Sequence, residues 1–255
     1  MTHPRLHAAA APDRPAVIMT DGSPGLTYGQ LESQANRGAQ LIRSLGIRRG
    51  DTVAYWLHNC PQVFEVYWAG QRSGCYITPI ATALTGGEAD YIVENSGAKL
   101  LVVSPEIEGL AELPRRPGVT VLTLEEWARA LAAQPAGPIA DESPGFHMVY
   151  SSGTTGRPKG VRLPLPEGEV TALHQLAAML EGRYAIGPAD TYLSPAPLYH
   201  TAPLAYTTAC HRLGASVVVM PKFEPEAALA AIERYRVSLT QMVPTMFVRL
   251  LTLPE

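Results

Sequence analysis

Short apolar runs alternate along this chain with longer stretches of helical periodicity, and this alternation limits the folds that the chain can adopt. Residues 51–57 read D-T-V-A-Y-W-L and have the composition of a buried strand. The preceding residues 29–45 carry Leu31, Ala35, Ala39 and Ile42 at helical spacing and end at Gly46. Because the same alternation continues to the last residues, it predicts an α/β protein with layered sheets and flanking helices.

The same signals predict the other elements. Helices are expected over residues 61–73, 86–95, 125–133, 170–180 and 224–235, with a further helix after Thr201. Strands are expected over residues 76–80, 99–103, 215–220 and 238–243, and near Tyr192 and Leu193. Residues 135–144 are rich in Pro, Gly and Ala and are the best candidate for a linker. We therefore expect a first α/β subdomain over residues 1–140 and the start of a second over residues 141–255.

Composition favours a small-molecule partner over a macromolecular one. The 20 Lys and Arg residues nearly balance 23 Asp and Glu, and the formal net charge of -3 gives no electrostatic reason to expect nucleic acid or an anionic membrane as partner. No run reaches the roughly 18 apolar residues of a transmembrane segment. The three scattered cysteines lack the spacing of a zinc site or a disulfide framework, so we expect a cytoplasmic protein.

The segment with the most chemistry is residues 150–161, Y-S-S-G-T-T-G-R-P-K-G-V, which follows a predicted strand. Its glycines let the backbone approach a polyanion, its hydroxyls and amides supply hydrogen-bond donors, and Lys159 adds a positive charge. The order differs from a Walker A loop, because Lys159 precedes Gly160 and no Ser or Thr follows it. The segment predicts a clamp for the phosphates of a nucleoside triphosphate, and the competing interpretation is a flexible surface turn.

This segment resembles the signature loop of the adenylate-forming, AMP-binding superfamily, which includes acyl-CoA synthetases, aryl-CoA ligases, luciferases and the adenylation domains of peptide synthetases. Residues 26–31, 50–54 and 84–92 are similar to stretches near the start of acyl-CoA synthetases. The resemblance implies the incomplete N-terminal domain of the acyl-CoA synthetase fold. It also implies that Thr154 lies near Mg²⁺, that Lys159 is catalytic, and that the phosphates of ATP are bound by Ser151, Ser152, Gly153, Thr154, Thr155, Gly156 and Lys159.

Residues 193–201, L-S-P-A-P-L-Y-H-T, resemble a second motif of the same family, and His200 is the catalytic candidate there. An imidazole at this point could stabilise charge on the substrate carboxylate or at phosphorus. The competing interpretation of His200 is a hydrogen-bonded packing residue. Near the last residues, Met246 and Phe247 are interpreted equally well as the wall of an acyl pocket or as ordinary core.

The function implied by the resemblance is ATP-dependent activation of a carboxylic acid to an acyl-adenylate and then to an acyl-CoA. The implied partners are the acid, ATP, Mg²⁺ and CoA, and the proline-bearing residues 162–167 resemble ligases for fatty or other bulky acids. Two alternatives stay open: a non-catalytic module that binds nucleotide or acyl groups, and an amino-acid adenylation domain.

Several parts that the family uses have no counterpart in these residues. They are a Tyr-Gly-x-Thr-Glu motif, an aspartate for the ribose, a hinge and a C-terminal domain with a lysine. We therefore expect the 255-residue chain alone to be inactive. We also expect self-association through the face at which the α/β layers are cut.

Overall fold

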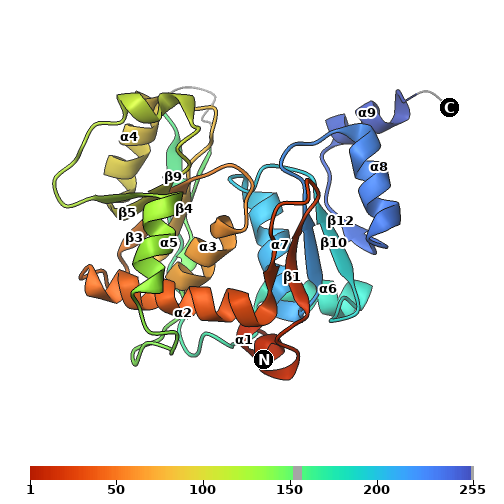
Figure 1. Ribbon diagram of the computed structural model, residues 1–255, viewed down its shortest axis with the longest axis horizontal. Helices are drawn as coiled ribbons and strands as arrows, with labels where there is room; N and C mark the ends of the chain where they lie inside the picture. Colours follow the sequence, from red (N-terminus) through yellow and green to blue (C-terminus); the bar gives the residue numbers. More distant parts are fainter. Residues whose placement is uncertain (152–156, 254–255) are drawn as a thin grey trace. The chain divides into compact units, whose positions relative to one another are not determined.

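The computed structural model describes residues 1–151 and 157–253 (Figure 1). They form two compact units, and each is described by itself. Unit 1 comprises Met1–Glu32, Asn59–Pro61 and Thr171–Glu255, and unit 2 comprises Ser33–His58 and Gln62–Val170. Among the described residues, no helix has both the length and the apolar character needed to cross a membrane.

Unit 2 contains a parallel sheet with the strand order β6-β5-β3-β4-β7. Its strands are β3 (Thr52–Trp56), β4 (Tyr76–Pro79), β5 (Ala98–Val103), β6 (Thr120–Thr123) and β7 (Phe146–His147). Its helices are α2 (Tyr28–Ser44), whose first residues belong to unit 1, α3 (Gln62–Arg72), α4 (Gly86–Ser96), the 3-10 helix η1 (Glu108–Glu112) and α5 (Leu124–Ala132). A separate antiparallel hairpin consists of β8 (Val149–Ser151) and β9 (Lys159–Val161).

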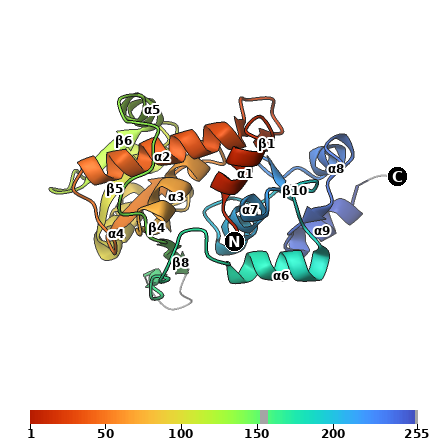
Figure 2. The same ribbon diagram turned by 90° about the horizontal axis from the view of Figure 1, so that it is seen from below.

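Helices cover both faces of the unit 2 sheet (Figures 1 and 2). On one face, Ile92 of α4 packs in a buried cluster with Trp56 and Leu101. On the other face, α3 approaches so closely that a Cβ on Gly70 would lie 2.8 Å from Ile77 Cγ1. Every residue of β3 is buried, as the apolar run 51–57 predicts.

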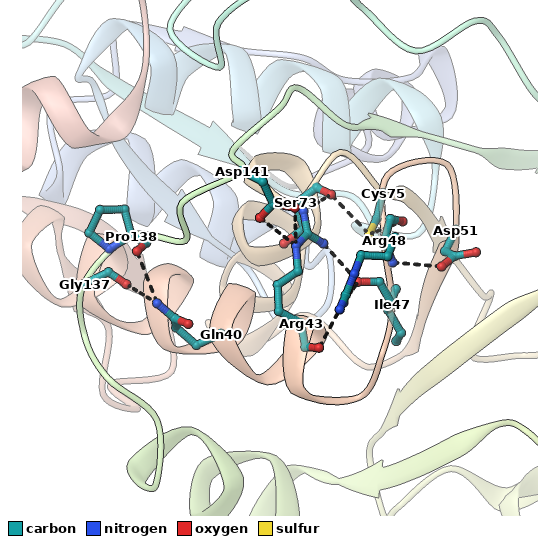
Figure 3. A network of polar contacts seen from close by, with 10 residues as sticks. All are labelled: Gln40, Arg43, Ile47, Arg48, Asp51, Ser73, Cys75, Gly137, Pro138 and Asp141. Atoms are coloured by element: carbon teal, nitrogen blue, oxygen red, sulfur yellow. Dashed lines mark hydrogen bonds and ion pairs between the residues drawn. The ribbon is translucent and has the colours of Figure 1, made fainter.

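The predicted linker, residues 135–144, is bound along α2 in unit 2 (Figure 3). Gln40 Nε2 donates to the carbonyl oxygens of Gly137 (3.0 Å) and Pro138 (3.2 Å). Arg43 Nε contacts both carboxylate oxygens of Asp141, at 2.9 and 3.0 Å. These residues therefore stay within one compact unit, and the proposed subdomain boundary at residue 140 remains a prediction about the family fold.

Unit 1 contains a sheet with the strand order β12-β10-β11-β1-β2, in which β2 is antiparallel to β1 and the other neighbours are parallel. Its strands are β1 (Pro15–Met19), β2 (Leu26–Thr27), β10 (Thr191–Ser194), β11 (Ser216–Val219) and β12 (Leu239–Thr240). Its helices are α1 (Pro4–Ala10), α6 (Gln175–Tyr184), α7 (Thr201–Leu213), α8 (Pro225–Arg234) and α9 (Pro244–Leu251).

Successive residues of β10 show which helices cover which face of this sheet. The Tyr192 ring stacks on Tyr206 of α7, with centroids 6.4 Å apart. The next residue, Leu193, is buried in a cluster with Ala228 of α8 and Met246 of α9. Since neighbouring side chains of a strand point to opposite faces, α7 covers one face and α8 and α9 cover the other.

The predicted α/β class is confirmed, and most predicted elements lie within two residues of their observed bounds. The helix predicted over residues 170–180 is wrong in its limits, because α6 begins at Gln175 and ends at Tyr184. The carbonyl oxygen of Thr171 accepts from the Thr2 N–H, which holds this stretch outside the helix. The strand predicted over 238–243 is also too long, since Pro244 starts α9 soon after β12 ends at Thr240.

Candidate active site

The hairpin β8–β9 frames the predicted phosphate-binding loop. The strands pair Val149 with Val161 and Tyr150 with Gly160, and they place Ser151 opposite Lys159. The two ends of the loop are therefore register partners in one antiparallel ladder. The remaining loop residues that we predicted, Ser152, Gly153, Thr154, Thr155 and Gly156, lie outside the described residues.

Tyr150 explains why a glycine follows Lys159. A Cβ on Gly160 would lie 2.6 Å from Met148 Cε and 2.8 Å from Tyr150 Cζ, so a larger residue would require both side chains to shift. The Tyr150 hydroxyl donates to Asn95 Oδ1 of α4 at 2.7 Å. Burial raises the pKa of Tyr150 to about 12, which keeps the phenol neutral. Tyr150 thus attaches the hairpin to α4.

The two cations that end the loop differ in their surroundings. The Arg157 guanidinium lies over the Tyr91 ring, 5.1 Å from its centroid, and the Tyr91 hydroxyl donates to Pro158 O at 3.3 Å. Lys159 is exposed, and no carboxylate among the described residues lies within ion-pair distance of it. Arg157 is therefore held by an aromatic contact, whereas the Lys159 ammonium is available to an anion.

The carboxylates beside this hairpin do not form a metal site. Asp90 and Glu94 of α4 face a pocket next to Arg157, and both are paired with Arg116. Within the residues that the structure describes, no group of three or more His, Cys, Asp or Glu side chains could hold a metal ion. The predicted contact between Thr154 and magnesium therefore stays a prediction.

His200 ends the connection between β10 and α7 in unit 1. It occupies the N-cap position of α7, a 13-residue helix, with extended backbone and no capping hydrogen bond from its side chain. Its ring is exposed and lies 4.6 Å from the Tyr199 ring, centroid to centroid. Partial desolvation lowers the pKa of His200, which favours the neutral imidazole. A neutral ring beside the first amides of a helix suits a negatively charged group.

Ser194 and Asn59 are polar residues of this region that were not among the predicted site residues. Ser194 ends β10, and its hydroxyl is fully buried with no hydrogen-bond partner among the described residues. The Asn59 side chain hydrogen-bonds to backbone groups just after β10 and β11. Asn59 lies in the loop between β3 and α3, and its partners lie more than a hundred residues away, so no local signal indicates its role.

The other candidate residues separate into core and surface. Met246 is buried in the unit 1 core, and Phe247 is half exposed. The His211 ring is completely buried, contacts the Ala16 carbonyl oxygen at 3.0 Å, and has its pKa lowered by burial to about 4. His58 is exposed. The candidate residues therefore form two groups, Ser151 with Lys159 in unit 2 and His200 in unit 1.

Comparisons with known proteins identify the family and the fold of this chain. The family model described as AMP-binding enzyme matches residues 5–255. The chain is 28% identical to the long-chain-fatty-acid–CoA ligase FadD13 of Mycobacterium tuberculosis (strain ATCC 25618 / H37Rv) over 264 residues, which is 98% of this chain and 51% of that ligase. It is 33% identical to feruloyl-CoA synthase of Amycolatopsis sp over 244 residues, which is 91% of this chain and 46% of the synthase.

A solved structure has the same fold. The inhibitor-bound crystal structure of the N-terminal domain of FACL13 from Mycobacterium tuberculosis matches with a TM-score of 0.86 and 26% identity. The match covers 100% of this chain and 66% of that one. The chain spans about half the length of the curated relatives that it matches.

Proposed function

The chain belongs to the AMP-binding enzyme family, and we propose that it carries the phosphate-binding part of a ligase that activates a carboxylic acid with ATP. In this proposal the acid is converted first to an acyl-adenylate and then to an acyl-CoA. The observation that carries the proposal is the β8–β9 hairpin, in which Ser151 is the register partner of Lys159. A loop of hydroxyls and glycines joins the two strands.

The chemistry of the acid explains why such a loop is useful. A carboxylate is a poor acyl donor, because its leaving group would be oxide. Transfer of AMP to the carboxylate, with release of pyrophosphate, supplies a phosphate leaving group that a thiol can displace. Lys159 would neutralise the phosphates that depart, and the loop amides would orient them. His200, at the first turn of α7, would face charge that develops on the carboxylate or at phosphorus.

The substrate class that we propose is a fatty or bulky aryl acid. The names of two relatives, a long-chain-fatty-acid–CoA ligase and a feruloyl-CoA synthase, support this choice. The proline-bearing residues 162–167 support it as well, because they resemble the same stretch in ligases for fatty or other bulky acids. A binding module without catalysis is the alternative, and it shares the prediction that ATP binds.

Calorimetric titration of the 255-residue chain with Mg-ATP tests the phosphate clamp. Lys159→Ala is expected to weaken binding by about ten- to a hundredfold, because a charge-assisted hydrogen bond is lost. Arg115→Ala is the matched control, because it removes one exposed positive charge from unit 2 outside the hairpin. Equal affinity of the two variants would refute the role of Lys159.

Pyrophosphate exchange tests whether this chain activates an acid by itself. A panel of fatty, aryl and amino acids would be tested with the 255-residue chain. We expect ATP binding without turnover, because the adenine, ribose and lysine motifs that the family resemblance implies have no counterpart here. Steady production of AMP and acyl-CoA by this chain alone would contradict the expected inactivity. Amino-acid-dependent exchange would favour an adenylation domain instead.

A further inference from the structure

The Asn59 side chain makes hydrogen bonds to three backbone groups of unit 1 and uses both of its N–H donors on them. Its Nδ2 donates to the carbonyl oxygens of Ala196 at 3.1 Å and Met220 at 2.8 Å. Its Oδ1 accepts from the Leu198 N–H at 2.8 Å. The partners fix the orientation of the amide, because two carbonyl oxygens require the donor end and an N–H requires the acceptor end.

These three backbone groups lie where regular structure stops. β10 ends at Ser194 and β11 at Val219, so Ala196 and Met220 fall just beyond the ladder. The last ladder bond runs from the Met220 N–H to the Ser194 carbonyl oxygen, at 3.1 Å. Beyond it, Pro195 and Pro197 have no N–H to donate. Asn59 therefore supplies the hydrogen-bond partners of these backbone groups, which neither a strand nor a helix provides.

The residues after Leu198 lead directly to His200. The His200 N–H donates to the Pro197 carbonyl oxygen at 3.1 Å. The His200 carbonyl oxygen accepts from the Leu204 N–H at 3.2 Å, in the first turn of α7. The residues on both sides of Pro197 are thus held by Asn59, and Pro197 holds the backbone of His200.

We propose that Asn59 is a positioning residue, which ties together the ends of two parallel strands and thereby sets the place of the His200 ring. Its importance for the reaction rests on the function proposed for His200. The ordering of residues 196–200 by Asn59 does not depend on that function. The two can therefore be tested separately.

Asn59→Asp is the sharpest perturbation, because it keeps the shape and the acceptor for Leu198. At neutral pH the carboxylate removes both donors and turns an oxygen toward two carbonyl oxygens. We expect the rate of hydrogen–deuterium exchange at the Leu198 amide to rise at least about tenfold. The reason is that each donor removed costs the net free energy of about one hydrogen bond. We also expect the NMR titration midpoint of the His200 ring to move, because its surroundings change.

Asn95→Asp is the matched control. Asn95 lies in unit 2, and its Oδ1 accepts one hydrogen bond from the Tyr150 hydroxyl, which a carboxylate also accepts. The control is expected to leave unchanged both the amide hydrogen exchange of residues 196–200 and the NMR titration midpoint of the His200 ring. If Asn59→Asp behaves like this control, the ordering role is refuted. If exchange rises and the His200 midpoint stays fixed, Asn59 supports the fold without positioning the ring, and the proposal fails.

The unmodified chain provides a measurement that survives a folding defect in the variant. Both Asn59 Nδ2 protons are expected to exchange slowly with solvent, because each is bound to a carbonyl oxygen. Exchange at the rate of a free amide would overturn the proposal. A negative pyrophosphate exchange assay would bear on the proposed function alone, because these measurements need no turnover.

Discussion

Replacing Glu65 with Gln is expected to stabilise unit 2 at neutral pH. Glu65 lies on α3 with only 5% of its surface exposed, and its carboxylate accepts one hydrogen bond, from Trp127 Nε1 of α5 at 2.9 Å. Burial raises the pKa of Glu65, and the Trp127 contact offsets only part of this effect. Gln keeps an oxygen for the indole and removes the charge. We expect a gain of about 1 kcal/mol in the free energy of unfolding, because a buried charge with one neutral partner is poorly compensated.

The pH dependence follows from the direction of the shift. A carboxyl group with a raised folded-state pKa binds its proton more tightly in the native chain than in the unfolded one. Its contribution to stability is therefore complete below the unfolded-state pKa and is lost as the pH rises through the folded-state pKa. The gain in stability from Glu65→Gln should be small near pH 4. It should grow as the pH rises and reach a plateau above the folded-state pKa of Glu65.

Tryptophan fluorescence during urea unfolding measures the free energy of unfolding of unit 2. The three tryptophans, Trp56, Trp68 and Trp127, all belong to unit 2, so their signal reports its unfolding. Glu112→Gln, at an exposed carboxylate of η1, is the control and should change stability by less than about 0.5 kcal/mol. A variant at Glu65 that is less stable than the wild type at pH 7, or a gain that does not vary with pH, would refute the reasoning.

Three further predictions use other contacts. Arg43→Ala should cost about 2 kcal/mol, because Arg43 binds Asp141 and also donates to the carbonyl oxygens of Ile47 and Ser73. It should loosen the chain at Asp141 while Gln40 still holds Gly137 and Pro138, and limited proteolysis that shows no faster cleavage near Asp141 would contradict it. Gly160→Ala should disturb the β8–β9 hairpin, since its Cβ meets Met148 and Tyr150, and amide exchange across the hairpin measures the effect. A thiol reagent should label Cys60 alone in the native chain, because burial raises the pKa of the other two thiols to about 12, and rapid labelling of a second cysteine would refute this.

Elements with a strong local signal could be predicted from the sequence. The apolar run of β3 and the helix α4 are examples, since α4 begins in a capping box of Thr85 with Glu88 and ends at Gly97, whose φ is 67°. The hairpin that frames the phosphate-binding loop is equally local, because its two strands are neighbours in the chain. A local signal sufficed for β3 and α4 because the residues that stabilise each element lie within it or beside it, whereas the strand β9 was not predicted.

Elements stabilised from far along the chain were missed or misjudged. β1 forms a parallel pair in which Val17 lies opposite Val217, and the N-terminal residues give little sign of a strand by themselves. α6 begins later than its periodicity suggests because Thr171 is bound to Thr2. Neither partner can be identified from a window of neighbouring residues. Long-range pairing therefore decided these bounds against the local preference.

The two motifs of the candidate site differ in whether their structure depends on local residues or on distant ones. The loop of residues 150–161 carries its donors, its glycines and its flanking strands within one short segment. The motif of residues 193–201 specifies His200, but its Ala196 carbonyl oxygen and its Leu198 N–H are bound by Asn59, which lies far away in the chain. Grafting the first segment onto another strand pair should preserve the pairing of Tyr150 with Gly160 and of Ser151 with Lys159. Grafting the second without an asparagine in the place of Asn59 should leave the carbonyl oxygen of Ala196 and the N–H of Leu198 unsatisfied, and with them the histidine unplaced.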